Sequence, residues 1–110
     1  MLQKPKGTRD FLPETCKDIR ELENLFVELC SYYGYKEIRY PMFERTALFE
    51  RGVGASSDIV RKEMFRVISG ANLEKYCQGT YDMQKEGLTL RPEGTAPVVR
   101  SFIENKLYAE

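Results

Sequence analysis

A long amphipathic segment near the N-terminus constrains the fold more than any other feature of the sequence. Apolar side chains recur at spacings of three and four residues between Ile19 and Tyr33, and they form one stripe. Pro13 suits the first position of a helix, and Gly34 suits the left-handed residue that ends many helices. These signals predict a helix from about Glu14 to Tyr33.

Three shorter segments have the composition of β-strands. Residues 35–40 alternate and are rich in aromatic and β-branched side chains, and Pro41 ends them. Residues 64–68 and 88–91 are also short and largely apolar. The pattern predicts an α+β fold, in which helices flank an antiparallel sheet of about three strands.

The segments around these strands predict turns and a further helix. A short helical turn is expected at residues 46–51, followed by a flexible glycine-rich loop at residues 52–57. Residues 70–86 contain several turn-forming side chains, and we expect a hairpin-like excursion there. Apolar spacing predicts a last helix from about Thr95 to Tyr108.

The sequence contains no histidine, which excludes every catalytic triad, dyad or zinc site that needs one within this chain. Its three cysteines, Cys16, Cys30 and Cys77, form no C-x-x-C pair and indicate neither a disulfide framework nor a zinc site. Cys16 and Cys30 lie within the first helical pattern and are expected to be small buried side chains. We therefore expect no metal site.

Charge and hydropathy favour an ordinary soluble domain. Seventeen Lys and Arg balance seventeen Asp and Glu, so the net charge indicates neither a nucleic acid nor a membrane partner. No apolar run approaches the roughly 18 residues of a membrane span, and the polar N-terminus has no signal-peptide core. A cytoplasmic location is expected, and 110 residues suffice for one small domain or a piece of a larger one.

Four short motifs together indicate a family. Residues 6–13 read KGTRDFLP, residues 33–41 read YGYKEIRYP, and residues 58–65 read DIVRKEMF. These segments and the helix between the first two resemble the histidyl-tRNA synthetases, which are class II aminoacyl-tRNA synthetases. Within them, the helix, the segment at residues 35–40 and its terminal Pro41 look like class II motif 1. Residues 88–96 read LTLRPEGTA, which is similar to the loop that holds the histidine substrate in that family.

The resemblance covers roughly residues 3–69 and 87–108, whereas residues 70–86 depart from the family's shorter turn. It implies that residues 1–110 are the N-terminal part of a class II catalytic domain. The motif 2 loop, motif 3 and the anticodon-binding domain are not found in the sequence. We accordingly expect no catalytic residue in this chain.

By resemblance, Glu93, Gly94 and Thr95 bind the histidine substrate. A carboxylate and a hydroxyl can accept hydrogen bonds from an ammonium group, and a glycine lets the backbone approach closely. The residues alone also support a purely structural interpretation, with Thr95 as the N-cap of the last helix and Glu93 near its dipole. The two roles are compatible.

The resemblance also implies a homodimer whose interface includes the motif 1 helix and strand. The candidate interface residues are Phe26, Tyr33, Tyr40 and Pro41. The residues alone favour a core position first for the aromatic cluster of this region, and a dimer surface second.

Several charged residues have simpler expected roles. Arg91 could bind a carboxylate or a phosphate, and a structural ion pair is its favoured role. Arg100 and Glu104 are expected to form an i,i+4 pair on a solvated or interface helix face. The N-terminal segment carries three basic residues, which give weak support for contact with RNA: Lys4, Lys6 and Arg9.

The implied parent activity is that of a histidine–tRNA ligase, which uses ATP and Mg²⁺ to activate histidine and then transfers it to tRNA(His). The 110-residue chain alone is expected to be inactive and to bind no cofactor stably. Two alternatives stay open: a regulatory subunit of ATP phosphoribosyltransferase, which is a synthetase paralogue, and a non-enzymatic dimerisation module. The intact Glu93-Gly94-Thr95 sequence favours the ligase over the paralogue.

Overall fold

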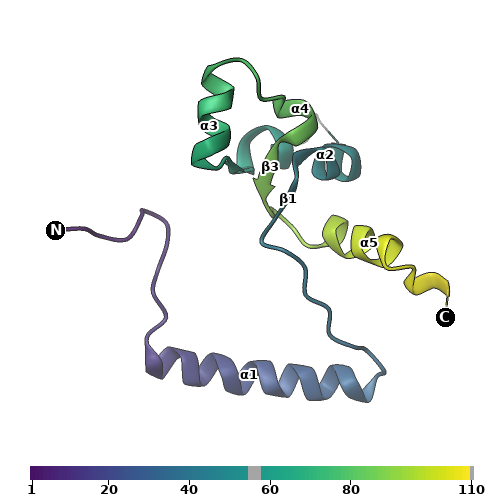
Figure 1. Cartoon of the computed structure of the whole chain (residues 1–110). Coiled ribbons are helices and arrows are strands. Elements are labelled where there is room, and N and C mark those ends of the chain that lie inside the picture. The colour runs from purple at the N-terminus through teal and green to yellow at the C-terminus, as the bar shows by residue number, and fades with distance from the viewer. Residues whose placement is uncertain (55–57, 110) are drawn as a thin grey trace. The chain divides into compact units, whose positions relative to one another are not determined.

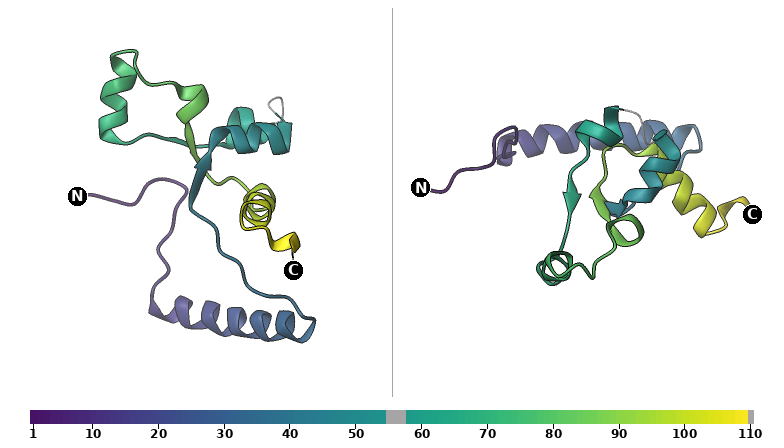
Figure 2. Two further views of the ribbon diagram at one scale, coloured as in Figure 1. Left: turned by 45° about the vertical axis from the view of Figure 1, so that its right-hand side comes forward. Right: turned by 90° about the horizontal axis from the view of Figure 1, so that it is seen from above.

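The computed structural model describes residues 1–54 and 58–109, and the chain divides into two compact units. The first unit is Met1–Ile38 and the second is Arg39–Glu110. Figures 1 and 2 show that the first unit contains one helix, whereas the sheet and the other helices belong to the second. Each unit is described by itself.

Helix α1 spans Pro13–Tyr32 and confirms the predicted N-terminal helix. Pro13 occupies its first turn, and Gly34 follows its end with a φ of +81°, as the sequence predicted. The helix buries none of its residues: Cys16 is exposed and Cys30 is half-buried, so the prediction that both are buried is wrong. The reason is that the described residues of Met1–Ile38 include no second element to cover the apolar stripe.

The second unit contains the three-stranded antiparallel sheet that the sequence predicted, in the order β1-β3-β2. Strand β1 is Phe43–Arg45, β2 is Arg66–Val67 and β3 is Leu88–Leu90. The Cα partners of Thr89 are Glu44 on one side and Arg66 on the other, which makes β3 the central strand.

The strand predicted at residues 35–40 is wrong, because the structure has no strand there and β1 begins beyond Pro41. Alternating side chains identify a segment that fits a pleated surface, but a strand also needs a neighbour with free backbone groups. Residues 35–40 pair with none of the three strands, since β3 pairs only with β1 and β2. The predicted strand at residues 64–68 is confirmed only in its centre, at β2.

The predicted helical turn at residues 46–51 is confirmed by α2, Thr46–Phe49, and its continuation η1, Glu50–Gly54. The loop predicted at residues 52–57 is therefore wrong for Gly52–Gly54, which end the π-helical η1, and residues 55–57 lie outside the described residues. A second π-helical segment, η2, spans Ile59–Glu63. The last predicted helix is α5, Thr95–Glu104, followed by the 3₁₀ segment η3, Leu107–Ala109.

Residues 70–86 form two helices rather than the predicted hairpin: α3, Gly70–Cys77, and α4, Met83–Glu86. The turn-forming side chains serve here as helix caps. Ser69 Oγ accepts from the Asn72 N–H at 3.2 Å, and Asp82 Oδ1 accepts from the Gln84 N–H at 3.0 Å. Because Ser and Asp favour both turns and N-caps, their presence alone does not distinguish a hairpin from a helix start.

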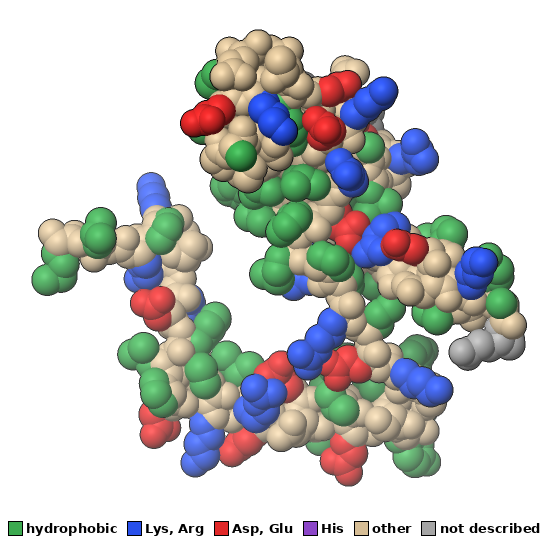
Figure 3. Space-filling view, in the orientation of Figure 1, with side chains coloured by type: hydrophobic (Ala, Val, Ile, Leu, Met, Phe, Trp, Pro, Cys, Tyr) green, Lys and Arg blue, Asp and Glu red, His purple; other side chains and the backbone are tan. Residues whose placement is uncertain are grey.

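The two faces of the sheet differ in character. Glu44 and Thr89 are cross-strand partners and both are buried, and the Thr89 hydroxyl shares a 2.6 Å hydrogen bond with that of Thr46. On the opposite face, Phe43 and Phe65 flank Leu90, and all three are exposed. Figure 3 shows hydrophobic side chains gathered over the strands. Among the described residues, Phe49 of α2 is the only hydrophobic side chain in the buried core besides Pro97 of α5.

Candidate substrate-binding turn between β3 and α5

The predicted histidine-binding residues lie in the turn between the central strand and helix α5. Glu93 Oε2 accepts a hydrogen bond from the Thr95 N–H at 2.6 Å, and Oε1 accepts one from the Ala96 N–H at 3.0 Å. The start of a helix leaves such N–H groups without partners inside the helix. Glu93 therefore caps α5.

This arrangement corrects the predicted N-cap. Thr95 is the first residue within α5, Gly94 holds the N-cap position, and Gly94 has no side chain to cap with. The capping group is the carboxylate of Glu93, which reaches forward over the turn. The favourable placement of Glu93 near the helix dipole is confirmed.

Capping does not use up the hydrogen-bonding capacity of Glu93. An ionised carboxylate has two oxygens and about four lone-pair positions. The two backbone N–H groups take one position on each oxygen. The carboxylate can therefore accept further hydrogen bonds from a ligand while it holds the helix start.

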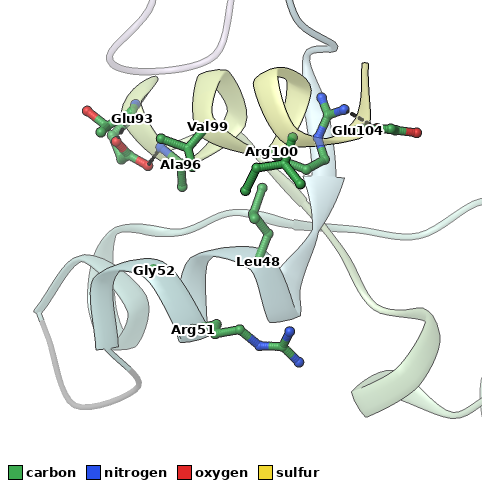
Figure 4. Close-up of a pocket in the computed structure, with 10 residues that line it drawn as sticks. Leu48, Arg51, Gly52, Glu93, Ala96, Val99, Arg100 and Glu104 are labelled. Carbon is green, nitrogen blue, oxygen red and sulfur yellow. Dashed lines mark hydrogen bonds and ion pairs between the residues drawn. The ribbon is translucent and has the colours of Figure 1, made fainter. Parts of the chain in front are cut away.

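A pocket of about 640 Å³ opens beside this turn, between α2–η1 and α5. Figure 4 shows Leu48 pointing from α2 towards α5, whereas Arg51 points away from α5. Gly52 lies close to α5, since a Cβ placed on it would be 3.3 Å from the Ala96 Cβ. The pocket is lined by Leu48, Arg51, Gly52, Glu93, Thr95, Ala96, Val99, Arg100, Ile103 and Glu104. Two of the three predicted histidine-binding residues thus line one pocket.

Arg100 joins α5 to the sheet. Its Nε and Nη2 donate to the two oxygens of Glu44 at 2.9 and 2.7 Å, and its Nη1 donates to Glu104 at 2.6 Å. The predicted Arg100–Glu104 pair is confirmed, but no sequence pattern predicted the partner Glu44, which lies 56 positions away and is only 8% exposed. The hydrogen bonds that Arg100 donates to Glu44, and secondly to Glu104, raise the pKa of Arg100, so the guanidinium stays charged.

Arg91 and Tyr40 form a second contact between distant segments. Arg91 Nη1 donates to the Tyr40 carbonyl oxygen at 3.0 Å, and the guanidinium carbon lies 4.7 Å from the centre of the Tyr40 ring. The sequence predicted a carboxylate partner for Arg91, whereas the structure shows a cation–π contact with an aromatic ring. The Tyr40 side chain also reaches Gly94, because a Cβ placed on Gly94 would overlap the Tyr40 hydroxyl oxygen.

The structure therefore brings Tyr40, a predicted interface residue, beside the predicted substrate turn. Pro41 is exposed in the same unit. Phe26 and Tyr33 lie at α1 and its end, in Met1–Ile38, where Phe26 is 64% exposed. The core position favoured for the aromatic cluster is wrong, since every member of it is exposed; the members are Phe26, Leu29, Tyr32, Tyr33 and Tyr35.

Residues 1–54 and 58–109 contain no group of three His, Cys, Asp or Glu side chains arranged to hold a metal ion. None of the helices in these ranges is both long and apolar enough to span a membrane.

Solved structures include one with a fold similar to that of this chain. The chain is similar to the crystal structure of apo Staphylococcus aureus histidyl-tRNA synthetase, with a TM-score of 0.70 and 42% sequence identity. The similarity covers 98% of this chain and 22% of that one. The fold is thus shared with part of an aminoacyl-tRNA synthetase.

Comparison of sequences gives the family. The histidyl-tRNA synthetase family model matches residues 7–108. A histidine–tRNA ligase of Listeria innocua is 51% identical over 99% of this chain, and one of Caldanaerobacter subterraneus is 50% identical over 96%. The chain belongs to the histidyl-tRNA synthetase family. It spans 23% of the length of the first of these relatives and 22% of the second.

Proposed function

We propose that this chain is the N-terminal part of the catalytic domain of a histidine–tRNA ligase, a class II aminoacyl-tRNA synthetase. The reaction joins histidine to ATP as histidyl-adenylate, with release of pyrophosphate, and then transfers the histidyl group to tRNA(His). One observation carries the proposal beyond family membership: the Glu93 carboxylate is fixed at a pocket wall by two backbone N–H groups and keeps acceptor capacity. Such a group suits the ammonium of an amino acid.

The contribution of this chain is to position the substrate. A carboxylate oxygen of histidine attacks the α-phosphorus of ATP, and the bond from that phosphorus to the pyrophosphate oxygen breaks. The attack needs no nucleophile from the protein, which agrees with a chain that contains no histidine. Glu93 would hold the amino group, and Thr95, exposed at the start of α5, would add a hydroxyl acceptor.

The proposed reaction uses ATP and Mg²⁺. Residues 1–54 and 58–109 contain no group of three His, Cys, Asp or Glu side chains that could hold the ion, so these residues do not fit Mg²⁺ by themselves.

The proposal includes a homodimer, tRNA as partner and a cytoplasmic location. Support for the dimer comes from α1, which carries an apolar stripe and buries none of it within its unit. Phe26 and Tyr33 lie on exposed positions of this region, as does Pro41 of the second unit. Exposed apolar patches of this kind commonly mark interfaces.

The direct test is histidine-dependent exchange of pyrophosphate into ATP by the full-length protein that contains this sequence. We expect exchange with histidine and none with other amino acids added singly. A full-length protein that shows no histidine-dependent exchange, or that dimerises without binding histidine, would contradict the proposal. The 110-residue chain alone is expected to give no exchange above a mock-purified control.

A further inference from the structure

The backbone conformation of residue 94 does not require a glycine. Its φ of −107° and ψ of −15° are accessible to any L-residue. A glycine at such a position is explained by space rather than by torsion angles. The space that a side chain would need at residue 94 is occupied by Tyr40, whose hydroxyl oxygen would overlap the added Cβ and whose Cζ would lie 3.2 Å from it.

Arg91 holds the Tyr40 ring in its place beside Gly94. The Arg91 guanidinium lies over its face, with the guanidinium carbon 4.7 Å from the ring centre. The same guanidinium donates to the Tyr40 carbonyl, and the Arg91 N–H donates to the Met42 carbonyl at 3.0 Å, which continues the pairing of β1 with β3. Both the ring and the backbone on either side of Pro41 are therefore held by one residue.

One aromatic ring thus contacts both ends of the substrate turn. Arg91, which follows β3, lies against the face of the ring, and Gly94, which precedes α5, lies against its hydroxyl. Glu93 lies between these two contacts in the sequence. Its carboxylate is tied to the first N–H groups of α5, so any shift of residue 94 moves the carboxylate too.

We propose that Tyr40, held by Arg91, is a positioning residue for the substrate amino group: it sets the place of the Glu93-Gly94-Thr95 turn by packing on Gly94. This inference rests on the proposed function. Tyr40 itself need not touch the substrate. Its role is to fix the separation between Gly94 and the segment that leads into β1.

This role can be tested in the full-length protein by adding a methyl group at residue 94 and then removing the Tyr40 hydroxyl oxygen that it would overlap. Gly94→Ala should raise the Michaelis constant for histidine and lower kcat/KM by about 10- to 100-fold, because small displacements of a binding group have effects of that order. Tyr40→Phe removes only the overlapping oxygen and keeps the ring under Arg91, so alone it should loosen the turn and raise the Michaelis constant for histidine by a smaller factor, about two- to fivefold. The double variant Gly94→Ala/Tyr40→Phe should recover most of the loss.

Gly70→Ala is the matched control. Gly70 begins α3 with open space around its Cα, so an added methyl group meets nothing within 4 Å. It should leave histidine kinetics unchanged. The Michaelis constant for ATP should stay constant throughout the series, which separates a displaced amino-acid site from general damage to the enzyme.

Two results would overturn the inference: a Gly94→Ala enzyme with normal histidine kinetics, or a defect that Tyr40→Phe does not relieve. If Gly94→Ala does not fold, Arg91→Lys gives the second test, because Lys keeps the charge but loses the planar group over the ring. Arg91→Lys should raise the Michaelis constant for histidine and not that for ATP, and an unchanged constant for histidine would contradict the inference.

Failure of the inference can be told from failure of the proposed function. A wild-type enzyme without histidine-dependent exchange would contradict the function itself. Histidine-dependent exchange that depends on Glu93 but shows no coupling between residues 40 and 94 would contradict only the role of Tyr40.

Discussion

The Glu93 carboxylate holds the start of α5 and faces the pocket at the same time. Sequence patterns correctly placed this residue in a turn between a strand and a helix, because Arg-Pro-Glu-Gly-Thr at a strand end is a local signal. They did not give its partners, since they assigned the cap to Thr95, and capping depends on where the helix begins to within one residue. The spacing of apolar residues does not define the first residue of a helix with that precision.

Contacts between distant residues were beyond prediction from one sequence. Arg91 meets Tyr40 across 51 positions, and Arg100 meets Glu44 across 56. Local spacing indicates Glu104 as a partner for Arg100 and no partner for Arg91. The register of β1 against β3 brings Glu44 and Tyr40 within reach of the two arginines. The sequence predicted the pair of Arg100 with Glu104, but neither Glu44 as its second partner nor Tyr40 as the partner of Arg91.

The two carboxylates that bind Arg100 should differ in their effect on stability. Glu44 is buried whereas the Glu104 side chain is 66% exposed. Glu44→Gln should lower the free energy of unfolding by about 1.5–3 kcal/mol, as expected for a lost hydrogen bond to a charged group. Glu104→Gln, its matched control, should cost only about 0.3–0.5 kcal/mol. Urea denaturation of the full-length variants measures both, and equal effects would contradict the assigned difference in burial.

At the scale of elements, α1, β3 and α5 were predicted because each has a local signal. Periodic apolar residues and Pro13 mark α1, and the turn after Leu90 separates β3 from α5. Residues 35–40 and 70–86 were mispredicted for a different reason. A strand exists only with a partner, and cap residues look like turn residues when the surrounding contacts are unknown.

Helices α3 and α5 should differ in their importance for the substrate turn. Helix α5 carries Ala96 and Arg100, which connect it to Glu93 and Glu44, whereas α3 lines no part of the pocket. A proline inside a helix removes a hydrogen bond and breaks or kinks it, at a cost of about 3 kcal/mol. Glu74→Pro in α3 should leave kcat/KM for histidine within about threefold, whereas Ser101→Pro in α5 should lower it by more than about tenfold.

Both variants would be assayed by pyrophosphate exchange after their secondary structure is compared by circular dichroism. Loss of histidine activity in Glu74→Pro would show that α3 supports the site. Normal activity in Ser101→Pro would contradict the dependence of the turn on α5.

At the scale of the whole molecule, much apolar surface is exposed in both units. The stripe on α1 and the row of Phe43, Leu90 and Phe65 on the sheet are uncovered among the described residues. The sequence predicted the sheet and α1 but not this exposure, since a pattern of apolar residues does not specify what covers them. Phe49 and Pro97 are the only hydrophobic side chains in the buried core of the part that the structure describes.

The 110-residue chain should therefore self-associate. Exposed apolar patches and strand edges favour contacts between copies. Sedimentation at micromolar concentration should give a dimer or a larger species, and Phe26→Glu on α1 should shift it towards monomer more than Lys17→Glu, its control on the same helix. A soluble monomer under these conditions would contradict the proposed interface.

The most direct measurement of the central claim is the histidine kinetics of Glu93→Gln in the full-length enzyme. The substitution keeps the size of the side chain but removes the charge that would pair with the substrate ammonium. Because a hydrogen bond to a charged group contributes about 1.5–3 kcal/mol, adenylation efficiency should fall by about 10- to 200-fold. The Michaelis constant for ATP should change little.

The stability of this variant serves as the internal comparison. Gln retains one oxygen for the N–H groups at the start of α5, so the cost in stability should stay near 0.5–1 kcal/mol, about that of a weakened cap. Glu74→Gln, an exposed carboxylate on α3, is the matched control and should behave as wild type. A large loss in histidine-dependent pyrophosphate exchange by Glu93→Gln, with ATP binding intact, is the predicted result. Near-wild-type histidine kinetics, with only a lowered melting temperature, would contradict the assignment of Glu93 to the substrate.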